Sequence, residues 1–488
     1  MALLRPTSLV FTVQRHEPEL VTPFKPTPHH DHCNSVSDVN GGEAKPTPDD
    51  HGCNLVSDVV NGGEAAAKPK PTPYETKLLS DIDDQEGHRF QIRGLHLYRF
   101  NSCMQGKDPA KVIREALSKA LVFYYPIAGR LREGPNRKLM VDCSGEGVLF
   151  IEADANITLD DFGDMLHPPF PCYDELLYEP AGSNQLLNCP LLQIQVTRLK
   201  CGGFIFAHRF NHTVSDAVGL IQFMSAIGEI ARGALTPSIP PVWERHLLNA
   251  RDPPVVTCIH DEYDFRTAAN GTYIPTDNLV HRSFFFGPTQ IRALRKLIPN
   301  NFNCSTFDLI TACLWRCRTK ALELGPDEDV RFICVVNVRY KFNPPLPLGY
   351  YGNALGYPAA IITAAKLCGN SLDYAIELVK QAKAKVTEEY MKSTADLMVI
   401  GGRPNVNTVR SFLVSDLTRA RFRDVDFGWG NAVFGGPASG QPIISFCIPS
   451  KNKEGEDGIV VPVCLPEPVM ETFIKELDQI LKDKETKF

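Results

Sequence analysis

Apolar and polar residues alternate along most of the chain with two periods, one typical of helices and one typical of strands. From residue 74 onward, apolar side chains three and four apart predict a helix over 108–124, and a proline and a glycine soon after it indicate its end. Two apolar runs within 138–152 are separated by the turn-forming residues 144–147. This arrangement predicts a β-hairpin.

The next part of the chain shows two more strands and a long helix. Apolar runs over 191–199 and 204–210 flank a glycine-containing turn, which predicts a second pair of strands. A helix is predicted from about residue 216 to 232, because its apolar residues fall on one side and Gly233 follows as a stop.

The second half of the chain repeats the mixture of strands and helices. A strand is predicted over 281–286, a helix over 306–322 and a strand over 330–339. Further helices are predicted over 372–390 and over 468–481. Both halves therefore indicate the α/β class.

A chain of 488 residues is longer than one ordinary hydrophobic core supports, so we expect two domains. The stretch 234–280 is rich in prolines and polar residues and divides the two series of elements. We therefore assign residues 1–28 and 70–233 to an N-terminal domain, 234–280 to a crossover linker and 281–488 to a C-terminal domain. The short apolar run 8–13 is interpreted as a strand, because it is too short for the core of a signal peptide.

Residues 29–69 interrupt the N-terminal domain with a duplicated polar segment. The sequence Lys-Pro-Thr-Pro starts at Lys25, Lys45 and Lys70, and Asn-Gly-Gly-Glu-Ala occurs twice between these copies. Two copies with few large apolar residues bury too little surface to offset the entropy of ordering, so we interpret the segment as a mobile insertion. We expect no metal site there, because the potential ligands lack the spacing of a closed site: they are His29, His30, Asp31, His32 and Cys33.

Charge and cysteine content narrow the classes of function. The net charge is -6 and no run of like charges stands out, which argues against a nucleic-acid partner. No apolar stretch reaches the length of a transmembrane helix, so we expect no membrane span. The 15 cysteines form no CxxC pair, which favours reduced thiols in the cytoplasm over a disulfide framework.

The first candidate for chemistry is the segment 210–216, which contains His212 and Asp216 in an HxxxD pattern. Strand alternation places His208 and His212 on one side of the predicted sheet, with His212 where the strand ends and the helix begins. A side chain at such a junction can project into a cleft, which suits a general base. Asp216 has two readings: it caps the helix beside the base, or it pairs with a distant arginine and braces the loop. His208 is interpreted as a packed core residue.

The second candidate is the pentapeptide Asp426-Phe-Gly-Trp-Gly, in which Gly428 and Gly430 flank Trp429. The two glycines indicate a tight backbone path with the indole packed inside. A dinucleotide site is a poor reading, because the third glycine of that fingerprint and the preceding strand are both missing.

Taken together, the HxxxD and DFGWG motifs resemble those of the plant BAHD acyltransferase family. Three further passages, over 78–84, 125–131 and 242–251, look like the subgroup of benzyl-alcohol benzoyltransferases, fruit-ester alcohol acyltransferases and alkaloid O-tigloyltransferases. The resemblance covers nearly the whole chain outside the insertion. It implies two chloramphenicol-acetyltransferase-like domains, the CoA-dependent acyltransferase fold, with an active-site channel between them.

The resemblance also implies roles for particular residues. His212 would be the general base, and Asp216 would turn away from the substrate to pair with Arg339. Asp426 belongs to the second signature, but the family usually places that motif far from the substrate, so we expect a structural role. One departure is Asn211, where the family often has another histidine.

Contacts to the acyl-CoA are implied at two further positions. Ser415 would donate a hydrogen bond to the thioester carbonyl; the alternative reading is an ordinary serine at a strand end. Ser305 and Thr306 match the family segment along the pantetheine arm, with Trp315 and Arg316 further along the same helix.

The resemblance implies an acyl-CoA-dependent O-acyltransferase that uses acyl-CoA as a co-substrate and has no permanently bound cofactor. The expected donor is tigloyl-, benzoyl- or a similar acyl-CoA, and the expected acceptor is a hydroxylated quinolizidine alkaloid, with benzyl or aliphatic alcohols as the alternative. We expect a cytoplasmic monomer. A non-catalytic binding protein with this fold and a hydrolase are the competing readings. The segment 435–445 looks shorter than in similar enzymes and leaves the shape of the substrate pocket open.

Overall fold

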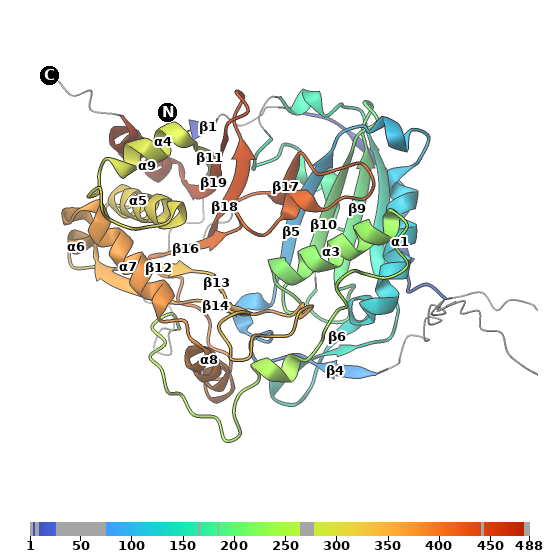
Figure 1. Ribbon diagram of the computed structural model, residues 1–488, viewed down its shortest axis with the longest axis horizontal. Helices are drawn as coiled ribbons and strands as arrows, with labels where there is room; N and C mark the ends of the chain where they lie inside the picture. The colour runs from blue at the N-terminus through green and yellow to red at the C-terminus, as the bar shows by residue number, and fades with distance from the viewer. Residues whose placement is uncertain are drawn as a thin grey trace, which may run out of the picture.

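The chain forms two halves that lie side by side, each built around a β-sheet (Figure 1). The structure is a computed structural model, and it describes residues 3–4, 9–25, 75–163, 166–183, 185–263, 278–440 and 444–482. The duplicated segment 29–69, with its histidines and cysteines, lies outside the described residues.

The N-terminal half contains, within the described residues, a seven-stranded sheet of mostly antiparallel strands. Along the sheet the strands are β17 (Phe434–Pro437), β5 (Gln91–Tyr98), β10 (Phe204–Asn211), β9 (Leu192–Arg198), β8 (Val148–Ala155) and β2 (Val13–Arg15), with β3 (Glu19–Val21) also paired to β8. Two helices, α1 (Pro109–Phe123) and α3 (Ala217–Ala231), pack against each other and share one buried apolar core with this sheet. A small sheet beside it has the order β4 (Thr76–Leu78), β7 (Leu139–Asp142), β6 (Arg130–Glu133), and a short helix α2 covers Tyr173–Leu176.

Helix α1 illustrates how local sequence sets these elements. The Asp108 side chain accepts a hydrogen bond from the Ala110 amide and caps the first turn, where amide groups lack helical partners. Its apolar residues, spaced three and four apart, are the ones that are buried. The helix predicted over 108–124 is therefore confirmed.

The C-terminal half contains a second sheet with seven strands in the described part of the chain. Their order is β1 (Leu3–Leu4), β11 (Leu279–Phe286), β19 (Asp457–Pro466), β18 (Ile444–Lys451), β16 (Ser411–Asp416), β12 (Asp329–Cys334) and β15 (Ala359–Thr363). Its helices are α4 (Pro288–Arg295), α5 (Thr306–Ala321), α6 (Ala364–Gly369), α7 (Leu372–Ala384), α8 (Glu388–Ile400) and α9 (Glu467–Leu481). Helix α5 is the central one, since α4, α6, α7 and α9 all contact it. The short pair β13 (Val336–Asn337) and β14 (Leu355–Gly356) reaches toward the other half.

Two segments cross between the halves, which corrects the domain boundaries drawn from the sequence. Strand β1 lies in the stretch assigned to the N-terminal domain but pairs with β11 of the C-terminal sheet. Strand β17 lies within 281–488 but pairs with β5 of the N-terminal sheet. Sequence order alone gives no sign of either exchange, because backbone pairing joins residues that are hundreds of positions apart.

Four predictions of secondary structure need correction. The runs within 138–152 form no hairpin, because β7 pairs with β4 and β6 while β8 joins the large sheet. The strand predicted over 330–339 is two strands, β12 and β13. The helix predicted over 372–390 is also divided, because α7 ends at Ala384 and Thr387 caps the start of α8. In the run 8–13, residues 9–12 belong to no strand, and β2 begins at Val13.

The other predicted elements are confirmed to within two residues at each end: the strand pair β9 and β10, strand β11, and the helices α3, α5 and α9. Across the described ranges, no helix combines the length and the apolar character that a membrane span requires.

Candidate active site

His212 lies directly after β10, where the strand gives way to the turn before α3. The Asn211 side chain accepts hydrogen bonds from the Thr213 amide (3.1 Å) and hydroxyl (2.7 Å), which shapes this turn. The His212 amide donates to the Phe90 carbonyl (2.9 Å). The backbone that carries the imidazole is therefore fixed on both sides, and Asn211, the departure from the family pattern, is part of the turn.

The His212 ring is only partly buried, unlike His208, which is fully buried in the N-terminal core as predicted. Its Nδ1 atom is buried and has no hydrogen-bond partner among the described residues. Phe90 touches the ring edge-on, with centroids 5.1 Å apart. With Nδ1 buried, Nε2 is the ring nitrogen left to meet an incoming substrate.

Burial lowers the pKa of His212 below its usual range. The peptide carbonyl of His212 itself, the Asp216 carboxylate and the Asn353 side chain favour the proton and oppose this shift. Since the ordinary value is about 6.5, the lowered pKa keeps His212 neutral near pH 7. A neutral imidazole is the form that a general base requires.

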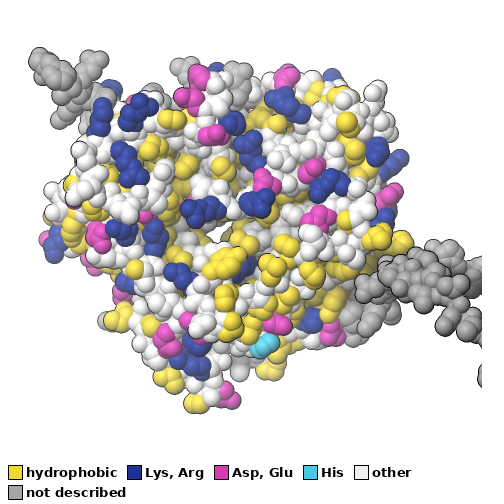
Figure 2. Space-filling view, in the orientation of Figure 1, with side chains coloured by type: hydrophobic (Ala, Val, Ile, Leu, Met, Phe, Trp, Pro, Cys, Tyr) yellow, Lys and Arg dark blue, Asp and Glu magenta, His cyan; other side chains and the backbone are white. Residues whose placement is uncertain are grey.

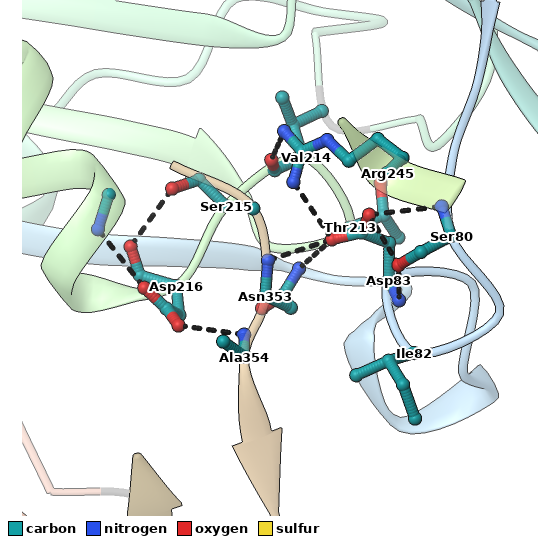
Figure 3. Close-up of polar contacts among 12 residues, drawn as sticks. Ser80, Ile82, Asp83, Thr213, Val214, Ser215, Asp216, Arg245, Asn353 and Ala354 are labelled. Carbon is teal, nitrogen blue, oxygen red and sulfur yellow. Dashed lines mark hydrogen bonds and ion pairs between the residues drawn. The ribbon is translucent and has the colours of Figure 1, made fainter. Parts of the chain in front are cut away.

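Asp216 is almost fully buried, with 1% of its side chain exposed. It forms an ion pair with Arg339, as the resemblance implies. Arg339 donates Nη1 to Oδ2 (2.8 Å) and Nη2 to Oδ1 (2.9 Å), which is a bidentate pair. The amides of Gly219 and Ala354 donate to the same carboxylate, each at 3.0 Å; Figure 3 shows the Ala354 contact. Burial would raise the pKa of Asp216, but the Arg339 charge and these hydrogen bonds lower it.

These four contacts decide between the two readings of Asp216. It caps α3 and braces the loop at once, and its lone pairs are directed to the arginine and the amides. It joins β10, α3 and the chain after β13, which belong to different halves of the molecule.

A second polar cluster holds the other side of the loop, and no role was predicted for its members from the sequence. Asp83 accepts from the Ser80 amide (3.1 Å) and hydroxyl (2.7 Å) and from the Asn353 amide (2.8 Å), as Figure 3 shows. The Asn353 side chain donates to the His212 carbonyl (2.7 Å), and Arg245 donates to the Val214 carbonyl (2.9 Å). Asp83 and Arg245 lie within two passages of the family resemblance, which is the one signal that could have found them.

Ser415 lies on β16 with its side chain on the face of the sheet that leads toward His212. Its neighbour Val414 is part of the C-terminal core, and adjacent strand residues point to opposite faces. Leu413, on the same face as Ser415, packs in a cluster with Tyr357. Tyr357 is separated from the His212 ring by a single hydrogen-bonded side chain. This placement is compatible with the predicted oxyanion contact.

The DFGWG loop lies at the other end of α3. Asp426 Oδ1 accepts from the amides of Gly428 (2.7 Å) and Gly430 (2.8 Å), both of which have positive φ. Arg232, at the end of α3, donates to the Asp426 carbonyl. Trp429 is buried in the N-terminal core, so the tight path and packed indole predicted for this motif are present.

Ser305 and Thr306 lie at the start of α5, where Ser305 forms a capping box with Asp308. The Ser305 hydroxyl donates to Asp308 Oδ2 (2.7 Å) and accepts from the Asp308 amide (3.1 Å). Trp315, further along α5, is fully buried in the C-terminal core, so the expectation that it borders the pantetheine arm is wrong. The sequence did not show which face of α5 is free to meet a ligand, because the helix is buried on almost every side.

A Ser–His–Glu arrangement occurs elsewhere, between the crossover linker and α8. His260 contacts Glu262 (2.8 Å) and Ser393 (2.9 Å), which are the contacts of a hydrolase triad. Ser393 is fully buried, however, and its hydroxyl oxygen accepts from the amides of Thr257 and Cys258. This serine therefore fastens the linker to α8 and is closed to substrates.

The candidate site lies where the two halves meet, since His212 comes from one half and Tyr357, Asn353 and Ser415 from the other. Figure 2 shows the surface hollowed along this boundary, with lysine and arginine side chains on one side of the hollow and apolar side chains on the other. The arrangement places a partly exposed histidine at the boundary between the two halves.

Comparison with known proteins identifies the family. The profile of the Transferase family matches residues 65–480. Benzyl alcohol O-benzoyltransferase of Petunia hybrida is 63% identical over 425 residues, covering 86% of this chain and 92% of that protein, and the Nicotiana tabacum protein of the same name gives the same figures. Alcohol acyl transferase 2 of Malus domestica is 57% identical over 422 residues, covering 85% of this chain and 92% of that protein.

Solved structures agree on the fold. Vinorine synthase superposes with a TM-score of 0.67 at 19% identity, covering 96% of this chain and 98% of that one. TRI101 of F. graminearum, in complex with coenzyme A and deoxynivalenol, gives a TM-score of 0.62 at 14% identity, covering 81% of this chain and 96% of that one. The predicted CoA-dependent acyltransferase fold is confirmed. The chain therefore belongs to the Transferase family, the BAHD acyltransferases, and is itself an acyltransferase.

Proposed function

We propose that this protein transfers an acyl group from acyl-CoA directly to the hydroxyl of a small alcohol, with His212 as the general base. One observation carries the proposal: at the boundary of the two halves, the partly exposed His212 buries Nδ1. An unassisted alcohol is a weak nucleophile, and a positioned base contributes roughly 10²–10⁴-fold to the rate.

The reaction follows from this geometry. Nε2 accepts the proton of the alcohol while the alcohol oxygen attacks the thioester carbonyl carbon. The carbonyl oxygen becomes an oxyanion, to which the Ser415 hydroxyl donates a hydrogen bond. The carbon–sulfur bond then breaks, the ester is released, and the proton on His212 passes to the CoA thiolate, which restores the neutral base. Asp216 and Arg339 hold the loop and take no proton.

Direct transfer is favoured over an acyl-enzyme. Such an intermediate needs a serine or cysteine beside the base. The sequence has no GxSxG elbow, and no cysteine flanks His212. Ser393, which does contact a histidine, is buried away from the site.

The proposal also names the class of acyl donor and of alcohol acceptor. The names of relatives at 56–63% identity support a benzoyl or other acyl donor and benzyl alcohol or another alcohol as acceptor. The resemblance stated from the sequence adds tigloyl-CoA as a donor and a hydroxylated quinolizidine alkaloid as an acceptor. We also propose a monomer in the cytoplasm; the location, not the monomeric state, is supported by the cysteines of the described ranges, all of which are free thiols.

A matrix of donors and acceptors tests the function. The purified protein is incubated with benzoyl-, tigloyl- or acetyl-CoA and with benzyl alcohol, an aliphatic alcohol or a hydroxylated quinolizidine alkaloid, and both free thiol and ester are measured. We expect thiol and ester in equal amounts, and only when an acceptor is present.

Two outcomes would point to the competing readings. Thiol release that does not depend on the acceptor would indicate a hydrolase. Binding of acyl-CoA, detected by calorimetry, without ester from any pair would indicate a non-catalytic binding protein.

A further inference from the structure

A second histidine, His88, lies flat against the His212 ring. It belongs to a short 3-10 helix, Glu86–His88, between β4 and β5, and is only 2% exposed. The two ring centroids are 4.7 Å apart and the ring planes differ by 2°. One face of the His212 imidazole is therefore covered by another imidazole, while Phe90 covers an edge.

Both nitrogens of His88 are engaged. Nδ1 lies 3.3 Å from the Asp83 carbonyl oxygen, and Nε2 lies 2.6 Å from the Tyr357 hydroxyl. A carbonyl oxygen can only accept, so the proton of neutral His88 is on Nδ1. Nε2 is then the acceptor for the hydroxyl of Tyr357. The tautomer and the orientation of His88 are both set by these two contacts.

His88 is also neutral near pH 7. Burial, with a smaller contribution from the neighbouring His212, lowers the pKa of His88 to about 3. Above that pH the ring presents an uncharged face to His212 and takes no part in proton transfer. Its effect on His212 is consequently one of shape and of exclusion of water.

We infer that His88 is a positioning residue, which fixes the plane of the His212 imidazole so that Nε2 faces the alcohol, and which Tyr357 anchors from the other half of the molecule. This inference rests on the proposed role of His212 as base. Rotation of an imidazole about its last side-chain torsion is broad and weakly restricted. A parallel ring on one face and Phe90 at the edge remove that freedom before the substrates arrive.

The charges around His212 do not depend on His88. The groups that face it are Asp216 at the start of α3 and Asp83 in the loop before the 3-10 helix. Each carboxylate is paired with an arginine, Arg339 and Arg245 respectively. Replacing His88 by a flexible polar residue thus leaves the charges in place but admits water, which moves the pKa of His212 back toward its ordinary value.

A matched pair of variants separates the ring from its hydrogen bond. His88→Gln keeps a polar partner for Tyr357 but has no ring, and the double variant His88→Phe/Tyr357→Phe keeps a flat ring and removes the hydroxyl that would lose its acceptor. We expect His88→Gln to lower kcat by about 10-fold to 100-fold with little change in KM. We expect the acid limb of its kcat–pH profile to lie at higher pH than in the wild type.

The double variant should lose clearly less kcat than His88→Gln and shift the acid limb less, because a flat ring still covers the His212 face although its anchor at Tyr357 is gone. Wild-type kcat and pH profile in His88→Gln would overturn the inference, and so would equal losses in both variants. If the Gln variant does not fold, as judged by its melting temperature, His88→Asn serves the same purpose.

His212→Ala, measured in parallel, distinguishes the two levels of the proposal. If it retains turnover, the proposed function fails and the role of His88 fails with it. If it is inactive while His88→Gln behaves as the wild type, only the role of His88 is wrong.

Discussion

The two signature aspartates lie at opposite ends of α3. Each accepts hydrogen bonds from backbone amides, but their surroundings differ. Asp216 caps the start of α3, is 1% exposed and is paired with Arg339. Asp426 packs against the end of α3, is 27% exposed, and lies 3.7 Å from Arg232. Helix α3 has 15 residues, so its two ends are roughly 22 Å apart.

The difference lies in what each aspartate holds. Asp216 joins the loop of His212 to the chain that carries Asn353, so it acts on the site itself. Asp426 shapes its own glycine turn, which leads into β17 and so attaches one half of the molecule to the sheet of the other. A shared motif residue type is therefore no evidence of a shared catalytic role, and neither aspartate is a proton acceptor in this account.

The largest effect is expected from Asp216→Ala, which leaves the buried Arg339 charge without its partner. We expect a loss of about 3–5 kcal/mol in the free energy of unfolding and a severe loss of kcat. Because the pKa of Asp216 is lowered in the fold, its contribution is present above the unfolded value of about 3.9 and is lost as pH falls through the folded pKa. Urea unfolding at pH 7 measures it, and wild-type stability together with wild-type kcat would refute the bracing role.

The next variant, Ser415→Ala, changes a residue on β16 of the C-terminal half, opposite the half that carries His212. If the hydroxyl stabilises the oxyanion, kcat should fall by about 10²–10³-fold while KM for acyl-CoA stays nearly unchanged. Initial rates at saturating acceptor measure both quantities. An unaltered kcat would leave Ser415 as an ordinary strand residue.

Asp426→Ala should be mainly a stability variant. It removes the acceptor of two amide groups, so we expect a loss of about 1–2 kcal/mol. The kcat of the folded fraction should stay within about twofold, since the motif lies at the far end of α3. A large fall in kcat at an unchanged melting temperature would show that the comparison between the two ends is wrong.

The smallest effect is expected from Ser305→Ala, at the start of α5. The hydroxyl is engaged in the capping box, so its removal should cost about 1 kcal/mol. If capping is its whole role, KM for acyl-CoA will not change. A rise of KM by about tenfold would instead support the contact with the pantetheine arm that the sequence suggested.

Much of the site could be predicted from the sequence because its determinants are local. The position of His212 at a strand–helix junction follows from alternation in β10 and from the cap at Asp216. The pairing of Asp216 with Arg339 came from the family resemblance, since 123 positions separate the two residues.

The rest could not be predicted because it depends on contacts between distant segments. His88 carries no pattern that marks it, and its significance appears only when Tyr357, 269 positions away, is seen to hold it against His212. In the same way, β7 and β8 are neighbours in the chain but pair with different partners. Trp315 was misplaced because a helix buried on nearly all sides gives no sign of which face meets a ligand.

The most direct test of the central claim compares His212→Ala with His246→Ala, in which an exposed histidine of the linker is removed. With benzoyl-CoA and benzyl alcohol, we expect kcat of His212→Ala to fall by about 10²–10⁴-fold or more, with an unchanged melting temperature. The wild type and His246→Ala should share an acid limb below the ordinary histidine pKa of about 6.5, because burial lowers the pKa of His212, and the residual activity of His212→Ala should lack it. A near-normal kcat in His212→Ala would contradict the account.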